Sequence, residues 1–177
     1  MTVVRHTRKG GFTLVEILIV VIILGILAAI VIPQFTSASQ DARRNSLSSQ
    51  LQTLRSQIEL YKLQHLDLLP QGLRTAGTVG AATAWNEMIN KTNAAGTVST
   101  GSDYPFGPYL QTEPSNPLNG GKGVVVTTAD VVGGAAFGAT TNEGFILNNA
   151  NGKIWGTSKG ATRVYDESQP SNTNNDL

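Results

Sequence analysis

The 177-residue chain has no cysteine, two histidines and few aromatic side chains, which make up 6% of the sequence. Without cysteine it has neither a disulfide framework nor a thiolate metal site, and cysteine usage gives no indication of the redox compartment. Because His65 has only His6 as a possible histidine partner, a histidine metal site is not expected either. We expect His65 to be solvated or to face the C-terminal dipole of a helix.

A strong excess of one charge is missing as well. The formal net charge is +1, and without Arg5, Arg8 and Lys9 ten basic residues face twelve acids, a charge of −2. Nucleic-acid-binding surfaces are basic, so no nucleic-acid partner is expected. The sequence also holds no phosphate loop, nucleophile elbow, zinc-binding helix motif or catalytic triad with the required spacing, which argues against an enzyme.

What the sequence does contain is one long apolar run, from Leu14 to Ile32. Of its 19 residues 15 are Leu, Ile or Val, and the others are a glycine, two alanines and Glu16. That length spans the hydrocarbon core of a bilayer. At roughly −0.3 to −0.6 kcal/mol each, the aliphatic residues outweigh the roughly +3 kcal/mol that a central carboxylate costs, so insertion is expected.

An uncleaved signal anchor and a secretory signal peptide are the general alternatives for such a run. A secretory signal has its small-residue cleavage site after the apolar segment, whereas here the small pair Gly10-Gly11 precedes it. Glu16 is a further difference, because an acid inside a membrane segment is a functional candidate that needs a partner.

The segment Gly11-Phe12-Thr13-Leu14-Val15-Glu16 resembles the N-terminal signature of the type IV pilin and type II secretion pseudopilin superfamily, and Pro33 falls at the spacing of that family. The resemblance implies that a prepilin peptidase cleaves after Gly11 and methylates the new N-terminal Phe12. It further implies that Glu16 serves assembly by pairing with the amino group of Phe12 on a neighbouring subunit.

A second segment resembles the major, or G-type, pseudopilin. It comprises Gly107-Pro108-Tyr109-Leu110, Pro114, and Asn116-Pro117-Leu118-Asn119-Gly120. Asn116 and Leu118 stand where that family has an acid and a tryptophan, and a generic pair of proline turns needs nothing beyond turn chemistry. No cofactor is expected. Calcium, which such pseudopilins often bind in a C-terminal loop, is left open, although no loop here gathers several carboxylates.

The fold implied is an α+β, pilin-like one, in which a long N-terminal helix packs its outer half on a small antiparallel sheet. We expect a leader at 1–11, a membrane and filament-core helix at 12–33, a globular domain at 34–165 and a disordered tail at 166–177. Gly25 and Pro33 are the least helix-favouring residues of the apolar helix and delimit its weakest part. The alternative is that Gly25 is a packing surface and Pro33 a simple kink.

The function implied is that of a structural subunit that polymerises into a periplasmic pseudopilus for protein export by type II secretion. Its expected partners are copies of itself, the prepilin peptidase, an inner-membrane assembly platform and that platform's ATPase. The basic leader indicates a cytoplasmic N-terminus and a periplasmic globular domain on the inner membrane. A major type IV pilin for adhesion or twitching remains an alternative, and a DNA-uptake minor pilin a more distant one.

In the globular part, apolar residues spaced by 3 and 4 continue the long helix to about Leu66, with Arg55 and Glu59 as an ion pair. A short helix is expected at 84–89, capped by Thr83, and a strand at 124–128. Asn151-Gly152 predicts a two-residue hairpin loop between strands 145–150 and 153–157, with positive φ at both loop residues. Phe145, Leu147 and Ile154 should then share the face that covers the long helix. Residues 163–165 are expected as a further edge strand.

Overall fold

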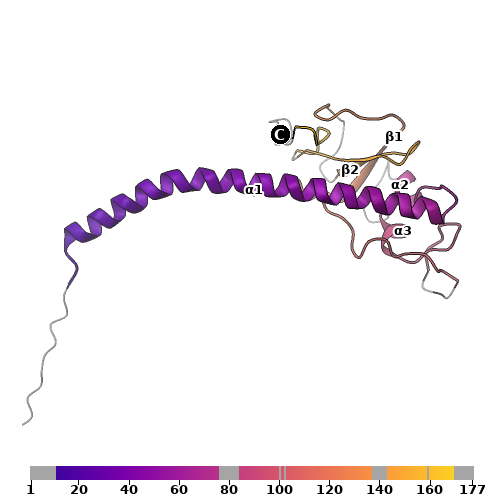
Figure 1. Cartoon of the computed structure of the whole chain (residues 1–177), viewed down its shortest axis with the longest axis horizontal. Helices are drawn as coiled ribbons and strands as arrows, with labels where there is room; N and C mark the ends of the chain where they lie inside the picture. The colour runs from indigo at the N-terminus through magenta and orange to yellow at the C-terminus, as the bar shows by residue number, and fades with distance from the viewer. Residues whose placement is uncertain are drawn as a thin grey trace, which may run out of the picture. The chain divides into compact units, whose positions relative to one another are not determined.

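A computed structural model describes residues 11–75, 84–99, 101, 103–136, 143–158 and 160–169. The chain forms two compact units, Met1–Gln40 and Asp41–Leu177. Its elements follow in the order α1 (Leu14–Gln64), α2 (Gln71–Thr75), α3 (Asn86–Ile89), β1 (Gly123–Thr127), β2 (Glu143–Asn148) and β3 (Ile154–Gly156) (Figure 1). The α+β class is therefore confirmed.

The C-terminal part of α1 is the spine of the second unit. The predicted apolar stripe is buried, with each side chain at most 2% exposed: Leu47, Leu51, Leu54, Ile58 and Tyr61. The helix ends at Gln64, before the predicted Leu66 and well before Pro70, because Leu66 and Asp67 adopt φ of 55° and 63°. A left-handed backbone cannot continue a right-handed helix.

The sheet is mixed, whereas a wholly antiparallel sheet was predicted. β1 pairs with β2 in parallel, and β2 pairs with β3 in antiparallel, in the order β1-β2-β3. Phe145, Leu147 and Ile154 join the apolar core formed by α1, as expected from their shared face. A Cβ on Gly156 would lie 2.9 Å from a methyl group of the fully buried Leu47, so a larger residue in β3 would have to displace that side chain.

The predicted two-residue hairpin loop is wrong. Leu147 pairs with Ile154 and Ile146 with Trp155, so the register is shifted by two residues from the predicted one and the loop is longer. A shift of two keeps every side chain on its face, and for this reason the predicted core face survives. Gly152 alone adopts positive φ, at 80°, while Asn151 does not.

Three further elements were predicted in the globular unit, and they are confirmed only in part. The strand at 124–128 is confirmed as β1, and the short helix at 84–89 is shorter, as α3, without a side-chain cap at Trp85. Thr83 lies outside the described residues. Residues 163–165 form isolated bridges, Ala136 with Arg163 and Thr157 with Val164, and no strand.

Arg55 does not pair with Glu59. Its guanidinium donates to both carboxylate oxygens of Glu167 and to the carbonyl oxygen of Ile154, while Glu59 accepts from Lys62. Glu167, the second residue of the predicted tail, is therefore bound to α1, and residues 170–177 lie outside the described part.

His65 is buried, with 1% exposure, so the expectation of a solvated side chain is wrong, while the alternative, a side chain that faces the C-terminal end of the helix, agrees with its contact to Tyr61. Its Nδ1 lies 2.8 Å from the carbonyl oxygen of Tyr61, and its Nε2 lies 2.9 Å from Oγ1 of Thr92. The ring also stacks on that of Tyr61 at 3.8 Å. The segment around Thr92 folds over the end of α1 and satisfies a polar side chain that would otherwise need water.

Candidate functional site

The predicted processing and assembly residues lie at the beginning of α1. Thr13 precedes the first helical residue, and its backbone N–H and hydroxyl donate to Oε2 of Glu16 at 2.8 and 2.7 Å. The N–H of Glu16 in turn lies 3.2 Å from the hydroxyl oxygen of Thr13. These reciprocal bonds form a capping box, which satisfies backbone donors that have no partner inside the helix.

Glu16 was predicted as an assembly residue, and its capping role was not predicted. The signal was present, because Thr13 and Glu16 are spaced as a capping box requires and stand directly before an apolar run. A carboxylate in the first turn also interacts favourably with the positive end of the helix dipole. The capping box thus holds the Glu16 carboxylate at the N-terminal end of the helix, which begins two residues after Phe12.

The bond between Gly11 and Phe12 lies outside any helix or strand. Both residues are exposed, Phe12 to 85%, and a Cβ on Gly11 would meet nothing within 4 Å. An exposed and irregular backbone segment is a substrate that a peptidase can bind in extended form. The predicted cleavage position is therefore accessible on its described side; the preceding residues 1–10 lie outside the described part.

The helix that follows is apolar all round and is not covered in the isolated chain. Every Leu, Ile and Val from Leu14 to Ile32 is between 39% and 81% exposed. By length and composition α1 could cross a membrane, and it is the one such helix in the described ranges. A surface of this size needs a hydrocarbon or protein environment, because contiguous apolar patches on soluble monomers are far smaller.

Gly25 and Pro33 do not join the site at the start of α1. They lie within the same helix, which the structure continues through both positions to Gln64. Pro33 has no N–H to donate to the carbonyl oxygen four residues earlier, so one backbone bond is missing there. The Thr36 and Ser37 hydroxyls donate to the carbonyl oxygens of Ile32 and Pro33 at 3.3 and 3.2 Å.

The second family-like segment lies in the globular unit and has a structural role there. Asn116 is buried, and its Nδ2 lies 2.8 Å from the carbonyl oxygens of both Gly144 and Thr157. Asn119 Nδ2 lies 2.8 Å from the hydroxyl oxygen of Thr157. Amide donors thus satisfy the oxygens that converge on this loop. No group of three or more His, Cys, Asp or Glu suited to a metal ion occurs among the described residues.

Comparison with known proteins identifies relatives of this chain. Residues 6–32 match the prokaryotic N-terminal methylation motif. The type II secretion system core protein G of Klebsiella pneumoniae is 32% identical over 112 residues, which cover 62% of this chain and 69% of the relative. That of Aeromonas hydrophila is 30% identical over 115 residues, 64% of this chain and 70% of the relative. That of Pseudomonas aeruginosa is 38% identical over 61 residues, 34% and 43%.

No solved structure matches this chain. The Klebsiella and Aeromonas alignments extend well beyond the N-terminal motif and cover more than two thirds of each relative. The chain belongs to the type II secretion system core protein G family, the family of the major pseudopilin.

Proposed function

We propose that this chain polymerises, after loss of residues 1–11, into a periplasmic pseudopilus that drives protein export by type II secretion. Family membership supports this function, and one observation of the structure supports polymerisation directly. The apolar side chains from Leu14 to Ile32 are exposed in the isolated chain. Burial against membrane before assembly, and against the same helices of other copies afterwards, stabilises the chain at roughly 1.5–3 kcal/mol per large side chain.

Before assembly the chain is anchored in the bacterial inner membrane by residues 12–33, with a cytoplasmic N-terminus and residues 34–165 in the periplasm. The three basic residues ahead of the apolar run support this orientation, because Lys and Arg favour the cytoplasmic side. The partners are the prepilin peptidase, other copies of the chain, and an inner-membrane assembly platform with its ATPase. The chain itself is a structural subunit and catalyses no reaction.

Cleavage between Gly11 and Phe12 creates an amino group two residues before the helix. The capping box holds Oε2 of Glu16 at 2.8 Å from the next backbone nitrogen, that of Thr13, so carboxylate and amine gather at one end of the helix. In an apolar environment each charge alone is costly and a pair offsets part of that cost. We propose that Glu16 pairs with the Phe12 amine of a neighbouring subunit, which sets the axial position of the incoming chain.

The test separates capping from charge. Glu16→Gln keeps an amide oxygen able to complete the capping box but removes the negative charge. Thr13→Val removes the capping hydroxyl and keeps the charge. We expect both variants to insert and to be cleaved, but only Glu16→Gln to assemble poorly, with Glu16→Asp retaining part of the wild-type yield. Sheared-filament yield relative to total membrane protein measures assembly, and intact mass measures cleavage.

Three outcomes count against the proposal. A normal filament yield from Glu16→Gln would leave the charge without a role, and equal losses in Glu16→Gln and Thr13→Val would assign Glu16 to helix capping alone. A mature N-terminus elsewhere than at Phe12 would remove the processing step, and Gly11→Val should leave the leader attached.

A further inference from the structure

Two loops of the globular unit share the sequence pattern Asn-x-x-Asn-Gly, at 116–120 and 148–152. In both, the glycine has positive φ, and its N–H donates to the carbonyl oxygen of the first asparagine at 2.7 or 2.8 Å. The first asparagine accepts the N–H two residues ahead on its Oδ1, and so does the second. The chain thus builds one loop twice, with two side-chain amides folded onto their own backbone.

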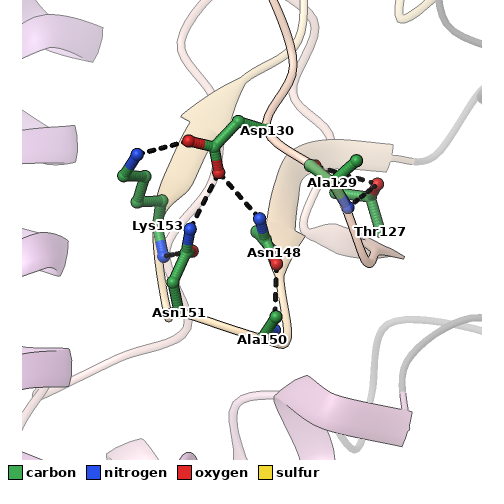
Figure 2. Close-up of polar contacts among 7 residues, drawn as sticks. All are labelled: Thr127, Ala129, Asp130, Asn148, Ala150, Asn151 and Lys153. Atoms are coloured by element: carbon green, nitrogen blue, oxygen red, sulfur yellow. Dashed lines mark hydrogen bonds and ion pairs between the residues drawn. The ribbon is translucent and has the colours of Figure 1, made fainter.

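The loops differ in which groups accept hydrogen bonds from the side-chain amide nitrogens. In the first loop the Asn119 Nδ2 donates to the carbonyl oxygens of Glu143 and Ser158 and to the hydroxyl of Thr157. In the second, one carboxylate takes this place: Figure 2 shows Asn148 and Asn151 both donating to Oδ1 of Asp130, at 2.7 and 2.8 Å.

Lys153 completes the cluster around Asp130. Its ammonium group donates to Oδ2, the second oxygen of the same carboxylate (Figure 2). The side chains of Asp130 and Lys153 are 47% and 59% exposed, so this ion pair by itself contributes little. The amide bonds to Oδ1 therefore connect the 148–152 loop to the segment after β1.

An Asn-Gly pair is chemically labile, because glycine has no side chain to hinder attack by its own backbone nitrogen on the preceding side-chain amide. The deprotonated glycine nitrogen forms a bond to Cγ, and the bond from Cγ to Nδ2 breaks as ammonia leaves. Water then opens the cyclic imide on either side and gives aspartate or isoaspartate. The reaction needs a free glycine N–H and an asparagine side chain that can rotate over it.

In the second loop the glycine N–H is not free and the asparagine side chain cannot rotate. Gly152 is buried, its N–H is bound to the carbonyl oxygen of Asn148, and a Cβ at this residue would lie 3.0 Å from Leu69. Oδ1 of Asn151 is held by the N–H of Lys153 and its Nδ2 by Asp130. We propose that Asn151 is a site of deamidation in this chain, and that its hydrogen bond to the Asp130 carboxylate suppresses the reaction in the folded protein.

The experiment uses the full chain in detergent, incubated at mildly alkaline pH, with deamidation at each asparagine followed by peptide mass spectrometry. In Asp130→Ala we expect the deamidation rate at Asn151 to rise on the order of tenfold. This is the factor expected when a hydrogen bond to a charged group is lost and the loop opens more often. Asn119, the equivalent residue of the first loop, serves as an internal control and should keep its rate. Lys153→Met should change neither rate, since both amide bonds to Asp130 remain.

Asp130→Asn, which keeps the side-chain shape and loses the charge, guards against simple misfolding and should give a smaller rise at Asn151. Equal rates at Asn151 in wild type and Asp130→Ala would overturn the proposal. So would a parallel rise at Asn119, which would indicate general loosening, or a wild-type rate as fast as that of a free peptide covering residues 146–156.

Discussion

The carboxylate of Asp130 gives the clearest pH dependence at the scale of single residues. Hydrogen bonds from Lys153, then Asn151 and Asn148, lower the pKa of Asp130 from 3.8 to about 2. In the unfolded chain Asp130 takes up its proton at higher pH than in the folded chain. Its contribution to stability is therefore complete above pH 3.8 and is lost as the pH falls towards about 2.

We expect Asp130→Asn to flatten the fall in melting temperature of the full chain in detergent between those two pH values. Asp67→Asn is the matched control, because Asp67 is an acid with 86% side-chain exposure and a distant Lys62 partner at 3.5 Å. If both variants follow the wild-type curve, the bonds around Asp130 contribute nothing to folding.

Some residues of the candidate site could be predicted from the sequence and others could not. Gly11, Phe12 and Glu16 could be named because their motif is local and continuous. The burial of His65 could not be predicted, because its partner Thr92 lies in a loop 27 residues away, and no periodicity encodes that contact. Asn116 was noted only as a departure from a family pattern, yet its amide joins three separate segments.

At the scale of elements, the two Asn-Gly loops allow a paired test of backbone strain. Gly120 and Gly152 have φ of 74° and 80°, but only at Gly152 would a Cβ meet a neighbour, Leu69 at 3.0 Å. We expect Gly120→Ala to lower the free energy of unfolding by about 1–2 kcal/mol. Gly152→Ala should cost ~1–3 kcal/mol more because it also overpacks the core.

Chemical denaturation of the full chain in detergent measures both values. An equal loss in the two variants would mean that Leu69 moves aside freely, and the contact with the loop would then be a loose one.

The helix α1 permits a second test, at Pro33. We propose that Gly25 and Pro33 delimit a weak segment that lets the helix rearrange on entering the filament. Pro33→Ala restores the missing backbone bond, so hydrogen exchange of the amides around it should slow, relative to wild type, while amides near Leu18 stay unchanged. The filament yield of Pro33→Ala should also be lower than that of the wild type. A slower exchange with full filament yield would reduce Pro33 to a kink.

The helices and strands could be predicted where a buried face determines their register. The predictions were wrong where the structure depends on a turn. The stripe from Leu47 to Tyr61 and the faces of β2 and β3 follow from periods of 3.6 and 2, which burial enforces. The mixed sheet could not be foreseen, because the alternation of side chains along β1 is the same whether β1 runs parallel or antiparallel to β2. The hairpin loop differed from the predicted one because the Asn148 and Asn151 amides stabilise a longer turn than Asn-Gly alone requires.

At the scale of the whole molecule, the two units differ in what they need from their surroundings. Every buried apolar side chain of the described residues lies at Leu47 or beyond, and every Leu, Ile and Val between Leu14 and Ile32 is exposed. The described part of the unit Asp41–Leu177 therefore contains an apolar core of its own, while residues 11–40 contribute no buried apolar side chain and depend on a bilayer or on other copies.

We expect the fragment 41–177 to be a soluble monomer that unfolds cooperatively without detergent, at a melting temperature near that of the same unit in the full chain. Size-exclusion chromatography and thermal unfolding by circular dichroism measure this. Leu51→Ala, which removes a fully buried side chain, should lower the free energy of unfolding by about 2–5 kcal/mol in fragment and full chain alike. Aggregation of the fragment, or a loss confined to the full chain, would show that residues before Asp41 help to form the core, and the filament-core helix could then not rearrange independently of the globular unit.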